Sequence, residues 1–546
     1  MNGSPSLRPR GPRGSLLVTV ALAASLAVAA IASSACSGCR TTPTPKGPAE
    51  TSAPTVRLYL ISDLAGALEP CGCTKDQLGG LDHVGAWIVS ERAKAPASGV
   101  VSAGPLFFMD PTLQPDHAAQ DTSKAETIAA SLKSLGFLGF APAKNDWAAG
   151  ASELAKLGAE SGGALLLANA KGAVPGSQAS VLRDIDGVKV GLIGVSLPDV
   201  PGVDAKPPIE SIKESIASLK KQGAQVIVAL ASVGRGEAKR IADLAPDLTA
   251  IVVGSAGGSG DQNTLAPPPE RIGNVIVAET GNHLTSLAVL DLYLRDGSST
   301  FADATGLEQG RKRDELARRI GELRVKIAAW ERDGKLAKSD IDARHADLTK
   351  LEAERAALDV RPPPQKGSFF RYTVREVRDS LGKDPGITAQ MLSYYKKVND
   401  TNRVAFEGRM PRPHTANEPA YLGVEVCTTC HIEAREFWDK TRHAKAYATL
   451  SGQFKEMNLD CVSCHVTGYE APGGSTVTHV ERLKDVQCEQ CHGPGGHHAL
   501  QPKKVSIPVP KPKPDSCLAC HHPPHVEQFD AAAKMEDILG PGHGKK

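Results

Sequence analysis

One short motif occurs four times in the last quarter of the chain, as Cys427-Thr-Thr-Cys430-His431, Cys461-Val-Ser-Cys464-His465, Cys488-Glu-Gln-Cys491-His492 and Cys517-Leu-Ala-Cys520-His521. Cys-x-x-Cys-His is the attachment signature of c-type haem: both thiols form thioethers to the haem vinyl groups, and the His binds the iron. Two intervening residues let both sulfur atoms reach one edge of a rigid porphyrin. The sequence therefore predicts four covalently bound haems, with the motif cysteines as attachment residues and, as proximal iron ligands, His431, His465, His492 and His521.

Zinc is the alternative metal, because paired Cys-x-x-Cys motifs also build zinc ribbons. A zinc ribbon does not need a His after every cysteine pair. With 16 His among 546 residues, a His after all four pairs would be a rare coincidence. Haem therefore explains the pattern better than zinc.

The second axial ligand of each haem must come from elsewhere in the chain. Twelve of the 16 His lie at or after His414, and the only methionines nearby are Met410, Met457 and Met535. Pairs of His ligands are therefore favoured over His/Met pairs, and they give lower reduction potentials. His443 lies in a predicted helix over 433–450; for the other five candidates a solvated surface role is an equal alternative. The distal candidates are His443, His479, His497, His498, His522 and His525.

The N-terminus has the pattern of an export signal. Three arginines precede an apolar, Ala-rich run over 16–32 that is short for a transmembrane helix. Cys36 stands where a lipoprotein would carry its lipid, with Cys39 as a second candidate, and cleavage at Ser33-Ser34-Ala35 without lipidation is the alternative. Because c-type haem is attached outside the cytoplasm, we expect an exported protein, periplasmic or lipid-anchored at a bacterial cell envelope.

Composition and length set the domain plan. The chain has 63 basic and 61 acidic residues, so no nucleic-acid partner is expected, and its length allows several domains. We predict a signal peptide over 1–36, a linker over 37–55, an α/β domain over 56–305, a helical hairpin over 306–362, a strand–helix connector over 363–420 and a haem domain over 421–546.

The α/β assignment rests on short apolar runs that alternate with helical patterns, which is typical of a buried sheet covered by helices. Strands are predicted over 56–61, 100–102, 164–168, 188–195, 226–231, 250–253, 275–278 and 284–294, and helices over 123–135, 210–222 and 236–244. In the next segment, an apolar stripe is formed by Leu316, Ile320, Leu323, Ile327 and Trp330, and Ser339 is expected to cap a second helix. We predict an antiparallel hairpin there, with a dimerising coiled coil as the alternative, and one more strand over 368–373.

The α/β region opens with a strand that ends in Asp, Leu58-Tyr-Leu-Ile-Ser-Asp63, followed by Glu69-Pro-Cys-Gly-Cys73 and Leu78-Gly-Gly-Leu81. This opening resembles bacterial 5′-nucleotidases of the calcineurin-like metallophosphoesterase superfamily, and the resemblance extends over about 56–296. It implies an αββα sandwich in which two metals activate water against phosphate esters.

Most metal ligands of that superfamily are replaced in this chain. Non-ligating side chains stand where ligands are expected, at Ala65, Pro105, Ser255 and Gly257, and no His precedes the glycine of Ser232-Val233-Gly234. The residues left over from the degenerate site are Asp63, Asn145 and Asp146. Three oxygen-bearing side chains do not supply a two-metal site, so we expect the fold without metals and without phosphatase activity. Cys71 and Cys73 are given no role beyond small residues in a turn, with a site facing a haem or a partner as the alternative.

Three segments of the C-terminal region carry a second resemblance: Trp438-Asp-Lys-Thr-Arg-His443-Ala-Lys-Ala446, Cys464-His-Val-Thr-Gly-Tyr469 and Val486-Gln-Cys-Glu-Gln-Cys-His-Gly-Pro-Gly495. They are similar to the tetrahaem cytochrome c family that includes the electron acceptor of hydroxylamine oxidoreductase. The resemblance covers about 421–525. It implies a mostly helical and irregular domain with closely stacked haems, mostly held by two His ligands, and it matches His443 to a distal ligand.

Electron transfer is the function that these patterns favour, with redox proteins or quinol-linked donors as partners and a lipid or signal anchor as the link to the membrane. One alternative is an oxidoreductase that acts on a small nitrogen or sulfur species at a five-coordinate haem. The others are a metal-dependent phosphohydrolase, which the missing ligands disfavour, and an α/β domain that binds a ligand or partner in its old cleft.

Overall fold

The computed structural model describes residues 53–70, 77–260, 262–333, 337–358, 364–522, 525–526 and 529–543. Ser52–Lys546 form one compact unit. The predicted export signal, the lipidation candidate Cys36, and Cys71 and Cys73 lie outside the described residues. Within the described part of the chain, no helix is both long enough and apolar enough to cross a membrane.

The first sheet of the α/β region has seven strands, and its centre is buried on both faces. β1 pairs in parallel with β2 and antiparallel with β11, so the sheet is mixed. In order across the sheet, the strands are β12 (Ala302–Asp303), β13 (Phe369–Glu376), β11 (Ser286–Tyr293), β1 (Val56–Ser62), β2 (Ser98–Ala103), β3 (Phe137–Ala141) and β4 (Ala164–Leu165). The continuous apolar run of β1 fits a strand that is covered on both sides.

The second sheet has six strands and is parallel at its centre, where β6, β7, β8 and β10 run in the same direction. In order, its strands are β5 (Ser180–Ile185), β6 (Val188–Ser196), β7 (Val226–Ser232), β8 (Ala250–Gly254), β10 (Val275–Ala278) and β9 (Glu270–Ile272).

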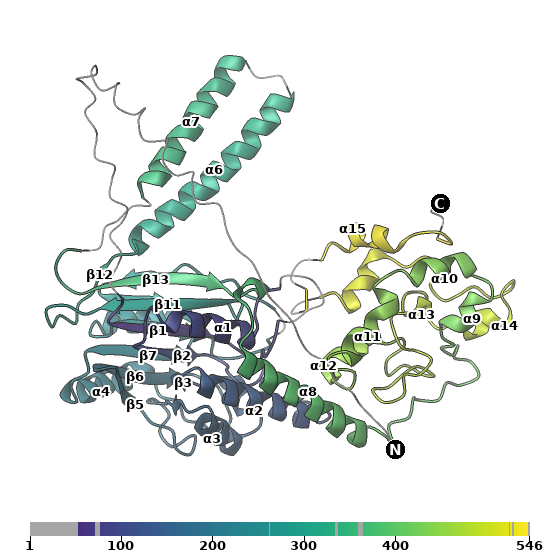
Figure 1. The fold of residues 1–546 in the computed structure, drawn as a ribbon, viewed down its shortest axis with the longest axis horizontal. Helices are drawn as coiled ribbons and strands as arrows, with labels where there is room; N and C mark the ends of the chain where they lie inside the picture. The colour runs from purple at the N-terminus through teal and green to yellow at the C-terminus, as the bar shows by residue number, and fades with distance from the viewer. Residues whose placement is uncertain are drawn as a thin grey trace, which may run out of the picture. The chain divides into compact units, whose positions relative to one another are not determined.

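The two sheets face each other between two helical layers (Figure 1). One core joins the inner faces of the sheets through residues such as Leu60, Val101 and Val228. The outer face of the first sheet packs on α1 (Leu81–Arg92), α2 (Ala118–Ser134), α3 (Ala151–Glu160) and α8 (Pro385–Ala405). The outer face of the second packs on α4 (Pro208–Lys221) and α5 (Arg235–Leu244). This order of layers confirms the predicted αββα class.

The predicted hairpin consists of α6 (Leu307–Asp333) and α7 (Lys338–Ala357), which lie side by side (Figure 1). Leu316, Ile320 and Ile327 of α6 are buried. Ion pairs join the helices, including Arg324 to Glu352 at 2.6 Å. The expected cap by Ser339 is wrong, because α7 begins at Lys338 and its N-cap is Ala337, which makes no side-chain cap bond.

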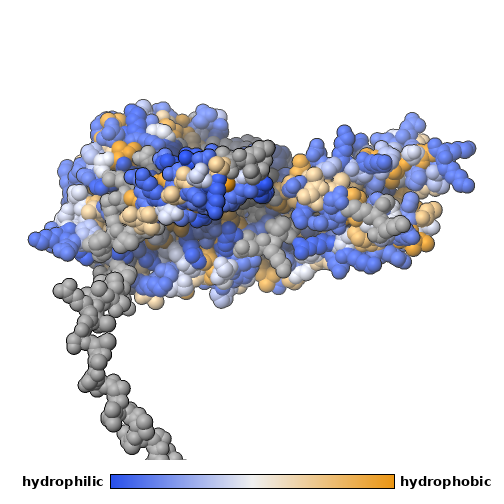
Figure 2. All heavy atoms as spheres, turned by 90° about the horizontal axis from the view of Figure 1, so that it is seen from above, coloured by the Kyte–Doolittle hydropathy of each residue, from blue (hydrophilic) through white to orange (hydrophobic). Residues whose placement is uncertain are grey.

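The C-terminal region contains short helices and loops around a small core that includes Val462, Val466 and Val477. Its helices are α9 (Val424–Thr428), α10 (Ile432–Trp438), α11 (Ala446–Ser451), α12 (Leu459–His465), α13 (Cys488–His492), α14 (Gly496–Leu500) and α15 (Ala531–Met535), with 3₁₀ turns at His443–Lys445, Pro514–Ala519 and Glu536–Ile538. A further 3₁₀ turn, Asp379–Leu381, lies between β13 and α8. On the face shown in Figure 2, apolar side chains are scattered among hydrophilic ones.

Several predicted boundaries differ from the structure. The helix expected over 433–450 is wrong, because α10 ends at Trp438 and His443 begins a 3₁₀ turn before α11. The strand expected over 164–168 is only Ala164–Leu165, and the strand expected over 368–373 runs from Phe369 to Glu376. In the α/β region, the sequence pattern missed α1, α3, β3, β5, β9 and β12.

Candidate functional site

The three residues left over from the phosphoesterase motifs lie where strands of the first sheet end. Asp63 follows β1, whereas Asn145 and Asp146 belong to the 3₁₀ turn Lys144–Trp147 that follows β3. Because β1, β2 and β3 are parallel, their carboxyl ends meet at one edge, which is where an α/β sheet usually binds ligands.

The Asp63 carboxylate is used by the protein itself. The Ser255 backbone N–H donates to both of its oxygens, at 2.9 and 3.2 Å. Burial raises the pKa of Asp63 to about 7, although the bonds from Ser255 act in the opposite direction, and the nearby Glu279 and Asp146 carboxyls add to the increase. Asp63 is therefore a poorly solvated acid within a backbone network.

Asn145 and Asp146 are also bonded to backbone groups. The Asp146 carboxylate accepts N–H bonds from Leu106 at 2.9 Å, Phe107 at 2.8 Å and Ala143 at 2.9 Å. Burial raises its pKa to about 6, against these bonds. The Asn145 amide donates to Gly258 O at 2.8 Å and accepts from Gly258 N at 2.9 Å. Both side chains hold loops in place.

The backbone closes the space between the strand ends. A Cβ on Gly104 would lie 1.7 Å from Asp63 Oδ1, and one on Gly254 would lie 2.2 Å from Gly104 N. Ser232 Oγ accepts from Gly104 N at 2.6 Å and donates to Ala141 O at 2.7 Å. Glycine at 104 and 254 lets two chain segments touch where a two-metal centre would need room.

Among the described residues, the one group of three or more acidic, His or Cys side chains with metal-ligand spacing lies elsewhere, at His117, Asp121 and Asp460. The Lys124 ammonium occupies that group, 2.8 Å from Asp460 and 3.7 Å from Asp121. A lysine already supplies the positive charge there, so the group is an ion-pair cluster.

Each of the four Cys-x-x-Cys-His motifs forms a single helical turn. The second and third motifs lie within α12 and α13. In the first and fourth, the backbone N–H of the His donates to the carbonyl of the first Cys: His431 to Cys427 at 3.0 Å and His521 to Cys517 at 2.9 Å. One turn brings residues i, i+3 and i+4 to the same side, which is the arrangement that one haem edge and its iron require.

Three of the four motif histidines face a second imidazole at nearly equal separations. The ring centroids are 6.4 Å apart for His431 and His498, 6.3 Å for His443 and His521, and 6.2 Å for His492 and His543. Two imidazoles on opposite sides of one metal, with metal–nitrogen bonds of about 2 Å, have centroids about 6 Å apart. These pairs therefore fit an iron between their rings.

The other distal candidates have different surroundings. His522 and His525 meet edge to face at 5.5 Å, and neither belongs to one of the three pairs. The Nδ1 atom of His479 lies within 3.3 Å of the Thr476 and Thr478 hydroxyls. His497, next to His498 in α14, is in none of the three pairs.

Backbone carbonyls fix the orientation of several of these imidazoles. Nδ1 donates to Ala446 O from His465 at 2.6 Å, to Val509 O from His492 at 2.9 Å and to Val505 O from His498 at 2.7 Å. A carbonyl only accepts, so the proton lies on Nδ1 and Nε2 carries the lone pair that binds a metal.

Burial also favours neutral rings. It lowers the pKa of His443, where the His521 ring adds to the effect, and it lowers the pKa of His543, where His492 contributes. A neutral imidazole is the form that ligates iron.

Two buried residues at the third motif, Glu489 within it and Gln487 just before it, hold the segment that leads into the first motif. The Glu489 carboxylate accepts backbone N–H bonds from Leu422 at 2.9 Å, Gly423 at 2.8 Å and Gly495 at 2.7 Å. Gln487 Oε1 accepts from Val424 N, the first residue of α9, at 2.7 Å. The attachment helices α9 and α13 are thus held at a fixed separation.

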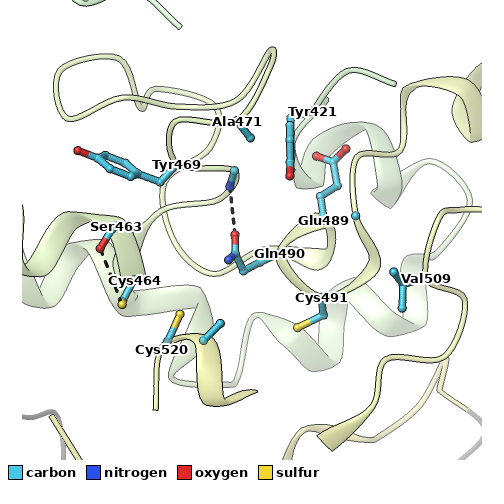
Figure 3. Close-up of a pocket in the computed structure, with 13 residues that line it drawn as sticks. Tyr421, Ser463, Cys464, Tyr469, Ala471, Glu489, Gln490, Cys491, Val509 and Cys520 are labelled. Carbon is cyan, nitrogen blue, oxygen red and sulfur yellow. Dashed lines mark hydrogen bonds between the residues drawn. The ribbon is translucent and has the colours of Figure 1, made fainter. Parts of the chain in front are cut away.

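Thiols from different motifs lie side by side. The Cys488 thiol raises the pKa of Cys427, and the Cys520 thiol lowers the pKa of Cys464. Figure 3 shows the Cys464 and Cys520 thiols pointing toward one another beside a cavity of ≈ 400 Å³ that Cys491 and Tyr469 also line. The first motif therefore neighbours the third, and the second neighbours the fourth.

The α/β region holds α12 from its other side through buried amides. Gln120 of α2 donates to Asn458 at 3.3 Å and accepts from Leu459 N at 3.0 Å. Asn402 of α8 donates to Gln120 at 3.1 Å and to Met457 O at 2.8 Å. Lys124 pairs with Asp460, which directly precedes Cys461. We call these contacts the α2–α12 seam.

Sequence reasoning did not single out His543, Glu489 or Gln487. His543 is 51 residues beyond His492 in a Gly-rich terminal segment, and only its type, a His in a region of His-ligated motifs, could have pointed to it. Glu489 could have been noticed because it is an acidic residue between the two cysteines of an attachment motif. It has no thiol and does not attach haem, so another role could be expected for it.

Part of the C-terminal region matches a known family of cytochromes. Residues 426–493 match the family described as cytochrome c554 and c-prime. Cytochrome c-554 of Nitrosomonas europaea is 33% identical over 96 residues, which cover 15% of this chain and 41% of that protein. The chain thus spans less than half the length of the curated relative it matches. The resemblance of this region to c-type cytochromes is confirmed, and with it the expectation of covalently bound haem.

Three solved structures are similar to this chain in fold. The 5′-nucleotidase precursor of Thermus thermophilus aligns with a TM-score of 0.43 and 16% identity, over 63% of this chain and 59% of that one. The NAD nucleotidase of Haemophilus influenzae gives 0.38 and 19%, over 44% and 48%. The calcineurin-like phosphoesterase YfkN of Bacillus subtilis gives 0.36 and 19%, over 44% and 86%.

Proposed function

We propose that this chain is an exported c-type cytochrome that binds four haems in its C-terminal region and transfers electrons. The observation that carries the proposal is the set of three imidazole pairs at 6.2–6.4 Å, each with one His from an attachment motif. Bound haem supplies one-electron transfer, and the protein sets its potential and accessibility.

The three pairs give a specific set of axial ligands. His431 and His498 serve the first motif, His492 and His543 the third, and His521 and His443 the fourth, while His465 is the proximal ligand of the second. The carbonyls of Val505 and Val509 orient two of these rings. The neighbouring thiols support close haem pairs, first with third and second with fourth.

Export follows from the chemistry of haem attachment and the N-terminal pattern. The mature protein is periplasmic or is held at the cell envelope by a lipid on Cys36, and its partners are redox proteins or quinol-linked donors. We propose the domain limits 56–305, 306–362, 363–420 and 421–546 as given from the sequence.

The α/β region acts as a scaffold without phosphatase activity. Its three leftover oxygen-bearing side chains are bonded to backbone groups, and Gly104 and Gly254 close the strand ends. Nucleotide and model phosphate-ester hydrolysis should stay at background when Mn²⁺ or Zn²⁺ is added. Metal-dependent hydrolysis that Asp63→Ala abolishes would contradict this.

The haem content can be measured directly. Denaturing electrophoresis with haem staining and intact mass should give four covalent haems per chain. A mass that corresponds to zinc, or to fewer than three haems, would overturn the proposal. Electron paramagnetic resonance of the oxidised protein then counts low-spin against high-spin haems and tests the axial pairs.

A further inference from the structure

A lysine-rich loop lies directly over two of the axial imidazoles. Residues 501–514, which we call the lysine loop, carry Lys503, Lys504, Lys511 and Lys513, and all four are exposed. No acidic residue lies between Glu489 and Asp515, and Glu489 is buried. Within the part of the chain that the structure describes, none of the four lysines forms an ion pair with a carboxylate. The loop is therefore an uncompensated patch of positive charge.

The loop is fixed to the haem-binding segments at two points. Val509 N donates to His492 O at 2.9 Å, and Val509 O accepts from His492 Nδ1 at 2.9 Å. Val505 O accepts from His498 Nδ1 at 2.7 Å. Pro508 packs on Gly493, where an added Cβ would lie 3.1 Å from the Pro508 side chain. Lys503 and Lys504 precede the first anchor, and Lys511 and Lys513 follow the second.

We infer that the lysine loop is the docking surface for a small acidic electron-transfer protein. This inference rests on the proposed function. Each anchoring carbonyl joins the loop to a histidine of an axial pair, so a partner on the loop is one hydrogen bond away from two iron ligands. In the exchange, one electron leaves the reduced partner and enters the haem region, with no transfer of a proton or other atom.

The composition of the surface favours a protein partner over a lipid surface. Leu500, Val509 and Leu518 stand among the lysines with exposed fractions of 80%, 40% and 42%, and a transient protein interface combines such apolar contacts with a charged rim. Prolines at 508, 510, 512 and 514 limit the backbone freedom of the loop, so little entropy is lost when a partner docks. Complementary charge raises the association rate of such partners.

The test measures electron entry from a defined acidic protein. The oxidised full-length protein is mixed anaerobically with reduced plant-type [2Fe–2S] ferredoxin at an ionic strength of about 0.1 M, where the Debye length is about 10 Å. One variant replaces all four loop lysines with Glu. The matched control replaces four exposed lysines of other elements with Glu, and its sites are Lys189, Lys221, Lys350 and Lys366.

In the loop variant, the second-order rate constant should fall by about tenfold or more, and it should depend less on salt concentration. In the control variant, the rate constant should change by about twofold or less. Equal losses in both variants, or no loss in the loop variant, would overturn the inference. A second outcome would also overturn the inference. In it, the loop variant loses binding to vesicles of phosphatidylglycerol and phosphatidylcholine in equal parts, while its rate with ferredoxin is unchanged. That outcome would assign the loop to a membrane surface.

Two further measurements keep the outcome interpretable. Reduction by dithionite at high salt needs no docking, so a parent protein that dithionite cannot reduce contradicts the proposed function, not the loop. If the Glu variant lacks the haem spectrum of the parent, the variant with Gln at the same four positions replaces it, and the same rate comparison decides.

Discussion

The strand ends of the α/β region and the imidazole pairs of the C-terminal region are both places where metals would be expected, and their polar atoms are used differently. At the strand ends, Asp63, Asn145 and Asp146 bond to backbone groups of their own domain. In the C-terminal region, His492 and His498 bond to backbone through Nδ1, and their rings face a second imidazole at iron-binding separation.

The proposal that the α/β region holds no metal rests on this difference. The Asp63 and Asp146 oxygens already accept backbone N–H bonds. The imidazole pairs instead have the centroid separation that two ligands of one iron would have. The residue types alone do not distinguish the two cases, because Asp63 is a common metal ligand.

Removing one imidazole of a pair should have the largest effect. We expect His443→Ala to convert one haem from low to high spin and to raise its potential, because two imidazoles hold the iron low-spin and favour the ferric state. Electron paramagnetic resonance and a redox titration measure both changes. His345→Ala, which changes an exposed His of α7, is the control and should leave the spectra unchanged; identical low-spin signals in His443→Ala and the parent would exclude His443 as a ligand.

A side chain added at the closed strand ends should have the next largest effect, a loss of folding stability. A Cβ at Gly104 overlaps Asp63, and φ is +90°, so Gly104→Ala should lower the free energy of unfolding by about 3–5 kcal/mol, from overpacking and backbone strain. Gly150 has φ +89° with nothing within 4 Å of an added Cβ, so Gly150→Ala isolates the strain at about 1–2 kcal/mol. Equal losses in chemical denaturation would mean that the strand ends have room to spare.

The sequence predicts the layers of the α/β region better than its details. Alternating apolar runs identify the central strands, because strands buried on both faces are apolar throughout. β5 escapes the pattern because it is an edge strand in which Arg183 and Asp184 interrupt the apolar residues. The helix expected around His443 is broken in the structure, where Trp438 donates its indole N–H to Val486 O at 2.8 Å.

The proposed haem ligands are also only partly predictable from the sequence. Attachment motifs are local and can be read directly from the chain, whereas a distal ligand is set by the fold. The pair of His492 and His543 joins a motif to the terminal segment, and no local pattern indicates such a partner. His443 and His498 are in the predicted set because their neighbouring residues carry signals of their own.

The α2–α12 seam connects the two regions and should be moderately important for stability. Lys124→Met leaves Asp460 without its main partner; burial alone would raise the pKa of that carboxyl, but Lys124 and His117 together hold it below its usual range. We expect a loss of about 1–2 kcal/mol, reduced from the cost of a fully buried pair because the Asp460 side chain is 36% exposed. Chemical denaturation should show a smaller loss for Lys156→Met, whose pair with Glu126 is more exposed; the reverse order would contradict a structural role for the seam.

The last effect is a pH dependence of stability that comes from Asp63. Its folded pKa of about 7 is above the value of about 3.9 for an unfolded chain. Between these values the folded state keeps a proton that the unfolded state releases, so this contribution is fully present below about pH 4 and is lost as the pH rises through about 7. Asp63→Asn cannot titrate and still offers an oxygen to Ser255 N–H, so the melting temperature should fall less between pH 4 and 7 than in the parent.

Asp243→Asn removes one exposed carboxyl and serves as the control. Since burial also raises the pKa of Asp146, to about 6, part of the slope should remain. A slope equal to that of the parent would mean that Asp63 is charged in the folded protein, as a metal ligand would be, and would reopen the question of a metal at the strand ends.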